Sequence, residues 1–250
     1  MKTELQKNGY LLIKKAFDVC LIDELKKEAE LFFLKQVQNH ISPNIEKMKE
    51  EYMFELFDKN FDAFQNCGKH IQHGSIKLHS LGTKKELIEI IKSCGVEYPS
   101  IATRPVLFFN HPKLSKKQVY YKTPPHQDWN SIRGSKDSIV VWIPLMDVKK
   151  ENGALRIVPF SHQEGSIMSG QIDGFGTVSK YGEEDYIDIE MDKGDILIFS
   201  SFLVHQSGVM TSNKIRWSCS FRYNNIKEKD FIKRNYEFSY IYKPKIKTGE

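Results

Sequence analysis

His126 and Asp128 stand two residues apart in the segment TPPHQDWN, residues 123 to 130. We expect a strand to begin here, in which side chains two apart point the same way, roughly 7 Å from each other. An imidazole and a carboxylate placed in this way can bind one metal ion. A mononuclear Fe(II) site of the facial-triad type needs one carboxylate and two histidines. Without a second histidine, the pair is more simply a surface histidine bonded to a carboxylate.

The strongest candidate for that second histidine is His205, which ends the segment GDILIFSSFLVHQSG. The apolar run before it predicts a strand that carries His205 to a rim of the fold. His162 lies in VPFSHQEG and is expected to be a structural residue of a turn. The other histidines fall in helical or loop-like segments and are expected at the surface or in packing: His40, His70, His73, His79 and His111.

Residues 215 to 223, IRWSCSFRY, alternate apolar with polar side chains. One interpretation is a half-buried strand whose polar face meets water. The other places this face in a binding site, where Arg216 holds a carboxylate through a two-pronged charged contact and Ser218 adds a donor. Arg216 follows His205 by eleven residues, so we expect a hairpin to bring them together. Arg222 lies farther along the same face and is expected to matter less.

The elements that must position these residues change character along the chain. Residues 9–17 predict a short strand, and apolar residues at three- and four-residue spacing predict a helix over 22–37. Two further helices are expected within 43–57 and 84–95. Later short runs rich in β-branched and aromatic residues predict strands at 104–110, 137–145, 154–158, 186–191, 195–200 and 215–223. We therefore expect a mainly β fold with N-terminal helices, a sandwich or jelly roll.

Composition excludes several classes of protein. The 250 residues are 40% hydrophobic, enough for a substantial core, and no apolar run approaches the ~20 residues that cross a bilayer. The first ten residues lack the apolar region of a signal peptide. The four cysteines are scattered singly, which favours reduced thiols in the cytoplasm: Cys20, Cys67, Cys94 and Cys219.

The net charge of +5 comes mostly from lysines mixed with acids, and this pattern does not indicate a nucleic-acid surface. An anionic small-molecule substrate is compatible with it, and no membrane partner is expected. We expect one domain over residues 1–250, with a helix-rich part at about 1–103, a β core at 104–223 and a basic tail at 224–250. Nothing in the sequence indicates the oligomeric state.

Four features in a fixed order resemble the phytanoyl-CoA dioxygenase family of Fe(II)/2-oxoglutarate-dependent oxygenases. They are HQD at 126–128, ENGALRIVPFSH at 151–162, His205 and Arg216. The resemblance extends from about residue 9 to residue 223. It implies a double-stranded β-helix, the cupin-like form of the jelly roll. It also implies Fe(II) as the metal, with 2-oxoglutarate and O2 as cosubstrates.

The same resemblance implies roles for single residues. Iron would be held by His126, Asp128 and His205, and Arg216 would pair with the distal carboxylate of 2-oxoglutarate. Positions relative to the motifs place three further residues near the cosubstrate: Gln127, Trp142 and Ser207. The family commonly has glycine where Phe160 stands, so the turn before His162 is expected to be shaped differently.

The implied reaction converts 2-oxoglutarate to succinate and CO2 and hydroxylates a small molecule that the sequence does not identify. Part of the substrate pocket is expected within residues 92–122, with apolar walls offered by Phe108, Phe109, Tyr120 and Tyr121. Two alternatives remain open. A cupin-like metal-dependent isomerase would not need Arg216, and a non-catalytic jelly-roll binding module would tolerate loss of the three metal-binding residues.

Overall fold

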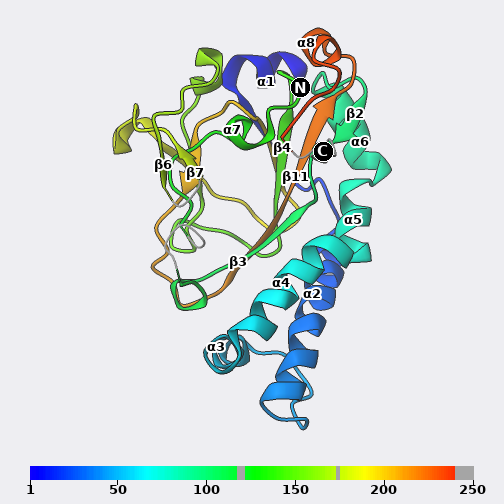
Figure 1. The fold of residues 1–250 in the computed structure, drawn as a ribbon, viewed down its shortest axis with the longest axis vertical. Helices are drawn as coiled ribbons and strands as arrows, with labels where there is room; N and C mark the ends of the chain where they lie inside the picture. The colour runs from blue at the N-terminus through cyan, green and yellow to red at the C-terminus, as the bar shows by residue number, and fades with distance from the viewer. Residues whose placement is uncertain (117–121, 173–174, 240–250) are drawn as a thin grey trace, which may run out of the picture.

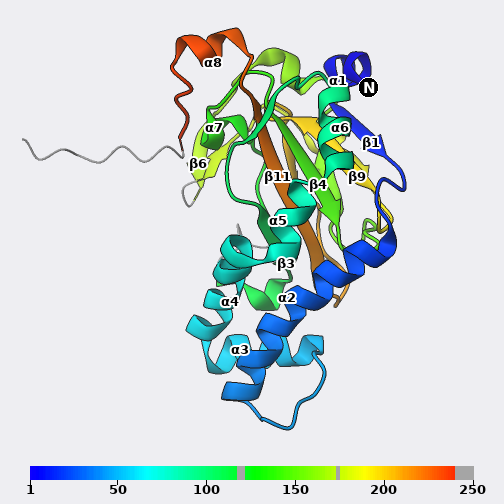
Figure 2. The ribbon, with the colours of Figure 1, turned by 90° about the vertical axis from the view of Figure 1, so that its right-hand side faces the viewer.

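The largest sheet of the protein is antiparallel and contains six strands in the computed structural model, which describes residues 1–116, 122–172 and 175–239. Figure 2 shows its central strands side by side. The strand order is β1 (Tyr10–Ile13), β9 (Ile196–Ser200), β4 (Ile139–Pro144), β11 (Arg216–Asn225) and β2 (Pro99–Ile101), and β3 (Val106–Asn110) also pairs with β11.

A smaller antiparallel sheet faces this one in the described part of the chain. Its order is β10 (His205–Ser207), β5 (Leu155–Ile157) and β8 (Ile187–Ile189). A separate hairpin is formed by β6 (Gly170–Ile172) and β7 (Phe175–Thr177). The antiparallel β core predicted from the sequence is therefore confirmed, although β2, β6, β7 and β10 were not predicted.

Both faces of the large sheet are buried. Successive side chains of a strand point to opposite sides, and each side packs against a different layer. On β4, Val141 and Ile143 pack with the helices in one hydrophobic cluster. Val140 and Trp142 pack on the other side, in a cluster that contains Leu155 of the small sheet. The side of the large sheet that faces the small sheet is thus the side that can enclose a site.

Helices cover the opposite face and extend beyond it, as Figures 1 and 2 show for α2, α3 and α4. The N-terminal helices are α1 (Lys2–Asn8), α2 (Val19–His40), α3 (Glu50–Lys59), α4 (Phe61–Gly74), α5 (Ile76–Gly82) and α6 (Lys85–Ser93). The predictions of α2 and α6 are confirmed. The helix expected within 43–57 begins only at Glu50, and α4 and α5 were not predicted.

The segment that forms α4 has a weak helix propensity, since it contains glycine, asparagine and histidine. Two contacts settle its conformation. The Asn60 side chain caps the helix by accepting a hydrogen bond from the Ala63 N–H at 3.0 Å, and Phe64, Cys67 and Ile71 are buried on one face. Tertiary packing therefore overrides a weak local preference for the helix.

The remaining short elements lie among the strands and after them. They are α7 (Trp129–Ile132), α8 (Lys229–Lys233) and the 3-10 turns at Pro112–Leu114, Ser161–Glu164 and Glu183–Asp185. The expected tail does not begin at residue 224, because β11 runs to Asn225 and Phe231 of α8 is buried. Residues 240–250 lie outside the described residues.

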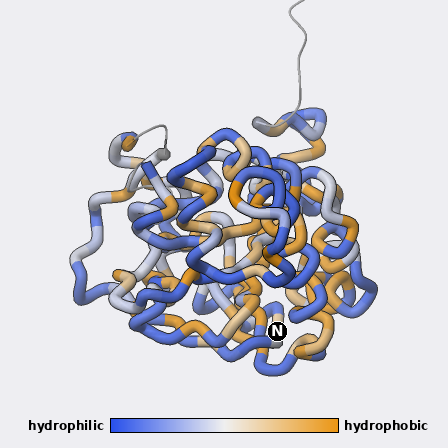
Figure 3. The backbone as a smooth tube through the Cα atoms, turned by 90° about the horizontal axis from the view of Figure 1, so that it is seen from below, coloured by the Kyte–Doolittle hydropathy of each residue, from blue (hydrophilic) through white to orange (hydrophobic). Residues whose placement is uncertain are grey.

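In Figure 3, hydrophilic segments trace much of the periphery and hydrophobic ones lie mostly inside it. None of the helices in the described ranges combines the length and the apolar character needed to span a membrane.

Candidate functional site

The structure brings His126, Asp128 and His205 together. One ligand atom from each lies within 4.8 Å of the others, and no other such group of metal-binding side chains occurs among the described residues. A pair of backbone hydrogen bonds joins the two histidines, from the N–H of each to the carbonyl of the other, both 3.0 Å. The two imidazole rings therefore lie side by side, with centroids 4.1 Å apart.

The predicted strand at residues 123–130 is wrong. His126 forms only an isolated bridge with His205, and Asp128 is the N-cap of α7 with helical backbone angles, φ −62° and ψ −28°. Two prolines precede His126 and remove two backbone donors, so a continuous ladder is unfavourable here. The convergence of His126 and Asp128 comes from a bridge followed by a helical turn.

Hydrogen bonds orient both imidazoles. Nδ1 of His126 lies 2.8 Å from the Pro124 carbonyl, and Nδ1 of His205 lies 3.0 Å from the Leu203 carbonyl. A carbonyl only accepts, so each Nδ1 carries the proton and each Nε2 is the basic nitrogen, as in metal-binding histidines. Burial and the neighbouring imidazole lower the pKa of His205 to about 3. Burial also lowers the pKa of His126.

Asp128 is 4% exposed, yet it stays ionised. Burial is the largest single effect and raises the pKa of this carboxyl group, but the Arg222 guanidinium and the two neighbouring imidazoles together outweigh burial and lower the pKa of Asp128 to about 2. Nη2 of Arg222 donates to Oδ1 of Asp128 at 3.2 Å, whereas Oδ2 has no hydrogen-bond partner among the described residues. At neutral pH the site therefore offers two neutral imidazoles and one carboxylate.

This group opens into a cavity of about 490 Å³ between the two sheets. Trp142 of β4, Phe199 of β9 and Arg222 of β11 line one side, and Leu155 of β5 and Ser207 of β10 line the other. The polar side chains of β11 are buried rather than wet, since Ser220 is 1% exposed and Arg216 is 3% exposed. The second interpretation of the alternating strand, a polar face turned into a site, agrees with this placement.

Arg216 lines the same cavity and is held from two sides. Its Nη1 donates to the Gly153 carbonyl, and its Nη2 donates to Oδ1 of Asn110 at 3.1 Å. Its Nε is buried with no hydrogen-bond partner in the described part of the chain. Burial lowers the pKa of Arg216 to about 10, so the guanidinium keeps its charge at neutral pH.

The hairpin expected between His205 and Arg216 is wrong. His205 belongs to β10, which pairs with β5, and Arg216 begins β11, which pairs with β3 and β4 in the other sheet. They share a cavity because the two sheets face each other. Ser218 follows Arg216 on the same face of β11, and its fully buried Oγ has no partner among the described residues. Unlike Arg216, Ser220 and Arg222, however, Ser218 is not among the residues that line the cavity.

The three residues expected near the cosubstrate all line the cavity. Trp142 and Ser207 present buried side chains there. The amide of Gln127 is already engaged: its Nε2 donates to the carbonyls of Gly165 at 2.7 Å and Phe202 at 2.6 Å, and its Oε1 accepts from the Ile167 N–H at 2.9 Å. Gln127 therefore ties two loops to the site, a role that the sequence did not indicate.

The expected apolar walls divide between two places. Phe108 lines the cavity, whereas Phe109 points to the other face of the sheet and packs against Phe33 and Trp217 with ring centroids 5.2 Å and 5.7 Å away. Phe109 is thus a core residue. Tyr120 and Tyr121 lie outside the described residues.

His162 lies away from the metal-binding group. Its Nε2 meets the Gln6 carbonyl at 2.9 Å, which agrees with the structural role expected for it. Phe160 has φ 66°, the left-handed region that favours glycine. Phenylalanine thus adopts a backbone conformation that glycine takes readily, and the expected reshaping of this turn stays a prediction.

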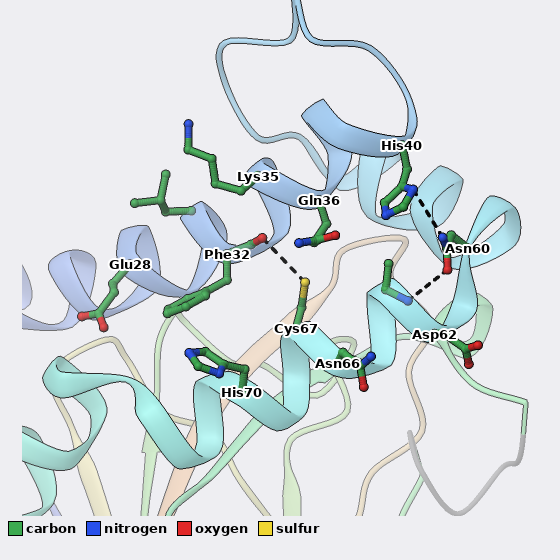
Figure 4. A pocket seen from close by; sticks show the side chains of 12 residues that line it. Glu28, Phe32, Lys35, Gln36, His40, Asn60, Asp62, Asn66, Cys67 and His70 are labelled. Atoms are coloured by element: carbon green, nitrogen blue, oxygen red, sulfur yellow. Dashed lines mark hydrogen bonds between the residues drawn. The ribbon is translucent and has the colours of Figure 1, made fainter.

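A second hollow, of about 820 Å³, lies in the helical part between α2 and α4. Figure 4 shows that His40, Cys67 and His70 line it, with the Cys67 thiol directed at the Phe32 carbonyl. These side chains form no group that could hold a metal ion among the described residues. The cavity at His126 is therefore the candidate active site.

Sequence reasoning missed two arginines that line this cavity, Arg104 and Arg133, and gave no role to a third, Arg222. Arg222 shares a strand face with Arg216, so the alternation of residues 215–223 was a usable signal. The expectation that Arg222 matters less than Arg216 for cosubstrate binding stays a prediction, although its contact with Asp128 gives Arg222 a role at the metal-binding group. No local pattern marks Arg104 or Arg133, which reach the cavity from loops.

Known proteins resemble this chain in both sequence and fold. A phytanoyl-CoA dioxygenase from Arabidopsis thaliana is 25% identical over 217 residues, which cover 80% of this chain and 75% of that protein. A 1-deoxypentalenic acid 11-beta-hydroxylase from Streptomyces exfoliatus is 23% identical over 156 residues, 58% of this chain and 55% of that protein. The chain thus spans between about half and three quarters of these relatives.

A solved structure extends the likeness to the fold. The non-heme alpha-ketoglutarate-dependent epimerase SnoN from nogalamycin biosynthesis superposes with a TM-score of 0.60 at 18% identity, over 90% of this chain and 81% of that one. The family model for phytanoyl-CoA dioxygenase matches residues 5–218, which include the metal-binding group and Arg216. On this match the chain belongs to the phytanoyl-CoA dioxygenase family.

Proposed function

We propose that the protein is an Fe(II)/2-oxoglutarate-dependent dioxygenase that hydroxylates a small molecule, built on a double-stranded β-helix formed by its two facing sheets. The observation that carries the proposal is the joint placement of His126, Asp128, His205 and the buried Arg216 in one cavity. Membership of the phytanoyl-CoA dioxygenase family supports the same reaction class.

The donor set fits Fe(II). Two neutral imidazoles and one carboxylate form the facial triad that leaves positions open for a chelating cosubstrate and oxygen. The carbonyls of Pro124 and Leu203 fix the Nδ1–H tautomers, which leaves Nε2 of His126 and His205 as ligand atoms. Oδ2 of Asp128, which lacks a hydrogen-bond partner among the described residues, would complete the set.

The buried polar atoms fit the distal carboxylate of 2-oxoglutarate. Nε of Arg216 is buried without a partner in the described ranges and belongs to a residue that lines the cavity. Oγ of Ser218, on the same face of β11, is also buried without a partner among the described residues and lies behind the cavity lining. A carboxylate accepts from both kinds of donor, and its contact with the guanidinium is charge-assisted. Trp142 and Ser207 would flank the cosubstrate. Gln127 would hold the loops that frame it.

When bound, Fe(II) and 2-oxoglutarate supply the oxidation: O2 and 2-oxoglutarate give succinate, CO2 and one oxygen atom inserted into a substrate C–H bond. The chain's own residues orient and shield. Arg222 keeps Asp128 ionised and fixes its carboxylate plane. Phe108, Val140 and Phe199 give the cavity apolar walls, which exclude water from the site.

The two alternative functions use this cavity less fully. A metal-dependent isomerase uses no 2-oxoglutarate. It therefore has no distal carboxylate to pair with the buried guanidinium of Arg216, whose Nε would stay unpartnered. A non-catalytic binding module has no need of two imidazoles locked in the metal-binding tautomer.

The test combines binding with turnover. Metal-free protein is loaded with Fe(II) without oxygen, and its iron content and 2-oxoglutarate affinity are measured. Oxygen is then admitted with a panel of small molecules, and succinate and products heavier by one oxygen atom are measured by mass. We expect stoichiometric iron, bound 2-oxoglutarate and succinate that increases with a true substrate. Protein that binds iron but not 2-oxoglutarate would favour the isomerase, and protein that binds neither would favour the binding module.

A further inference from the structure

We propose that the substrate carries an oxyanion, a carboxylate or a phosphoryl group, which Arg104 and Arg133 bind at the mouth of the cavity. The inference rests on the proposed function, since it names the substrate class of the same site.

Backbone contacts bring both arginines to the Arg222 end of β11. Arg104 follows Ala102, whose N–H donates to the Arg222 carbonyl at 2.9 Å, and it precedes Val106, which pairs with Ser220. Arg104 therefore flanks the stretch of β11 that ends at Arg222, and its side chain lines the cavity.

Arg133 reaches the same end from the other side. It ends α7, the helix that Asp128 caps. Two residues later the Ser135 N–H donates to Oδ1 of Asn224 at 3.1 Å, which fixes this loop against β11. The side chain of Arg133 also lines the cavity, so three guanidiniums surround one end of it.

The charges of the lining are unbalanced. The described lining residues include four arginines and a single acid, Asp128. Arg222 pairs with that acid. Arg216 lies six residues from Arg222 along β11, about 20 Å at the usual rise per residue, so it belongs to the other end of the cavity. Neither Arg104 nor Arg133 has an ion pair or a side-chain hydrogen bond with any described residue. Fe(II) and dianionic 2-oxoglutarate cancel each other's charge, so their binding leaves this excess in place.

An excess of guanidinium at a cavity mouth attracts anions and binds them with a defined geometry. The guanidinium fork matches a carboxylate or phosphoryl group, and the cluster raises the local concentration of anionic ligands. Arg133 also has φ 50°, a left-handed conformation that residues other than glycine rarely adopt. An arginine kept in a position suited to glycine is consistent with a use for its side chain.

The rest of the lining describes the other part of the substrate. The deeper walls are apolar and aromatic: Phe108, Val140, Trp142, Leu155 and Phe199. A molecule with an anionic head and an apolar body matches both regions. Octanoate and octyl phosphate are simple probes of this kind, and octanamide is the neutral counterpart of octanoate.

The experiment measures binding rather than turnover. Protein is loaded with Mn(II), which does not support the oxidation, and with saturating labelled 2-oxoglutarate, so that Arg216 is occupied. Calorimetric titration with the three probes follows, and retention of the label is checked. We expect octanoate or octyl phosphate to bind at least tenfold more tightly than octanamide, with the label retained. The stronger of the two identifies the head group.

Variants assign the preference to its residues. Arg104→Gln and Arg133→Gln should each reduce the preference for the anion by roughly three- to tenfold, because both side chains are exposed and solvent weakens their charged contacts. Arg156→Gln is the matched control, because Arg156 of β5 pairs with Asp188 of β8 and does not line the cavity. It removes the same charge and should leave the preference unchanged.

The results separate failure of this inference from failure of the proposed function. Equal affinity for octanoate, octyl phosphate and octanamide, or an anion preference that survives both variants, overturns the inference while 2-oxoglutarate binding stands. Displacement of the label by the anions also overturns it, since the anions would then occupy the Arg216 end. Protein that binds no 2-oxoglutarate at the outset overturns the proposed function instead.

Discussion

Replacement of Arg216 tests the link between the buried guanidinium and 2-oxoglutarate. A charge-assisted hydrogen bond contributes about 1.5 to 3 kcal/mol, so Arg216→Ala should weaken 2-oxoglutarate binding by roughly ten- to a hundredfold or more. Arg216→Lys should lie between alanine and the natural protein. The guanidinium already donates to the Gly153 carbonyl and to Asn110. A single ammonium cannot keep these contacts and also reach the carboxylate.

The same contacts predict a loss of stability, which the assay must separate from the loss of affinity. The Arg216→Ala variant loses two buried hydrogen bonds, so its free energy of unfolding should be about 1 to 3 kcal/mol lower than that of the natural protein. 2-Oxoglutarate affinity is therefore titrated with Mn(II)-loaded protein well below the unfolding temperature, with metal content measured in each variant.

Arg156→Ala is the control, because Arg156 is a guanidinium outside the cavity. Arg222 cannot serve, since it touches Asp128. Unchanged 2-oxoglutarate affinity in Arg216→Ala, with full metal content, would refute the assignment of Arg216 to the cosubstrate and would make the isomerase the better hypothesis.

Four further outcomes follow from the structure. His205→Ala should abolish Fe(II) binding, whereas His162→Ala should keep the iron and lower only thermal stability. Iron analysis and melting curves measure both effects, and loss of iron from His162→Ala alone would contradict the assignment of the iron ligands. Phe160→Gly should be about 1 kcal/mol more stable than Phe160→Ala in denaturant unfolding, because only glycine relieves the left-handed backbone at φ 66°; equal stabilities would argue against strain there. Alkylation of native protein at neutral pH should modify Cys20 alone, since Cys67, Cys94 and Cys219 are buried. Burial raises the pKa of the Cys67 thiol from 9.0 to about 11. The stability that the buried neutral thiol contributes is therefore present below pH 9 and should be lost as pH rises through 11. A free energy of unfolding that does not change over this range would contradict the prediction.

Local patterns in the sequence determined much of the β core. Runs such as 137–145 and 195–200 became the central strands β4 and β9. Their continuous apolar character reflects burial of both faces, one against the helices and one against the small sheet. The alternation in residues 215–223 also showed which side chains of β11 share a face. Whether that face meets water or a site was decided only by the opposite sheet, which encloses the cavity.

The tertiary structure decided how the site is assembled. His126 and Asp128 converge through a bridge to His205 and the first turn of α7. Arg216 shares their cavity because two sheets face each other, and this depends on pairings between strands far apart in the chain. The helix α4 likewise owes its conformation to packing against α2 and α3.

The arginines at the cavity mouth show most clearly what local sequence determines and what tertiary structure determines. Arg222 was visible in the strand period, but its partner Asp128 lies 94 residues earlier. Arg104 and Arg133 occupy loops whose course is set by hydrogen bonds to β11. Sequence periodicity reports which way a side chain points within its own element, whereas charge balance in a cavity depends on elements that only folding brings together.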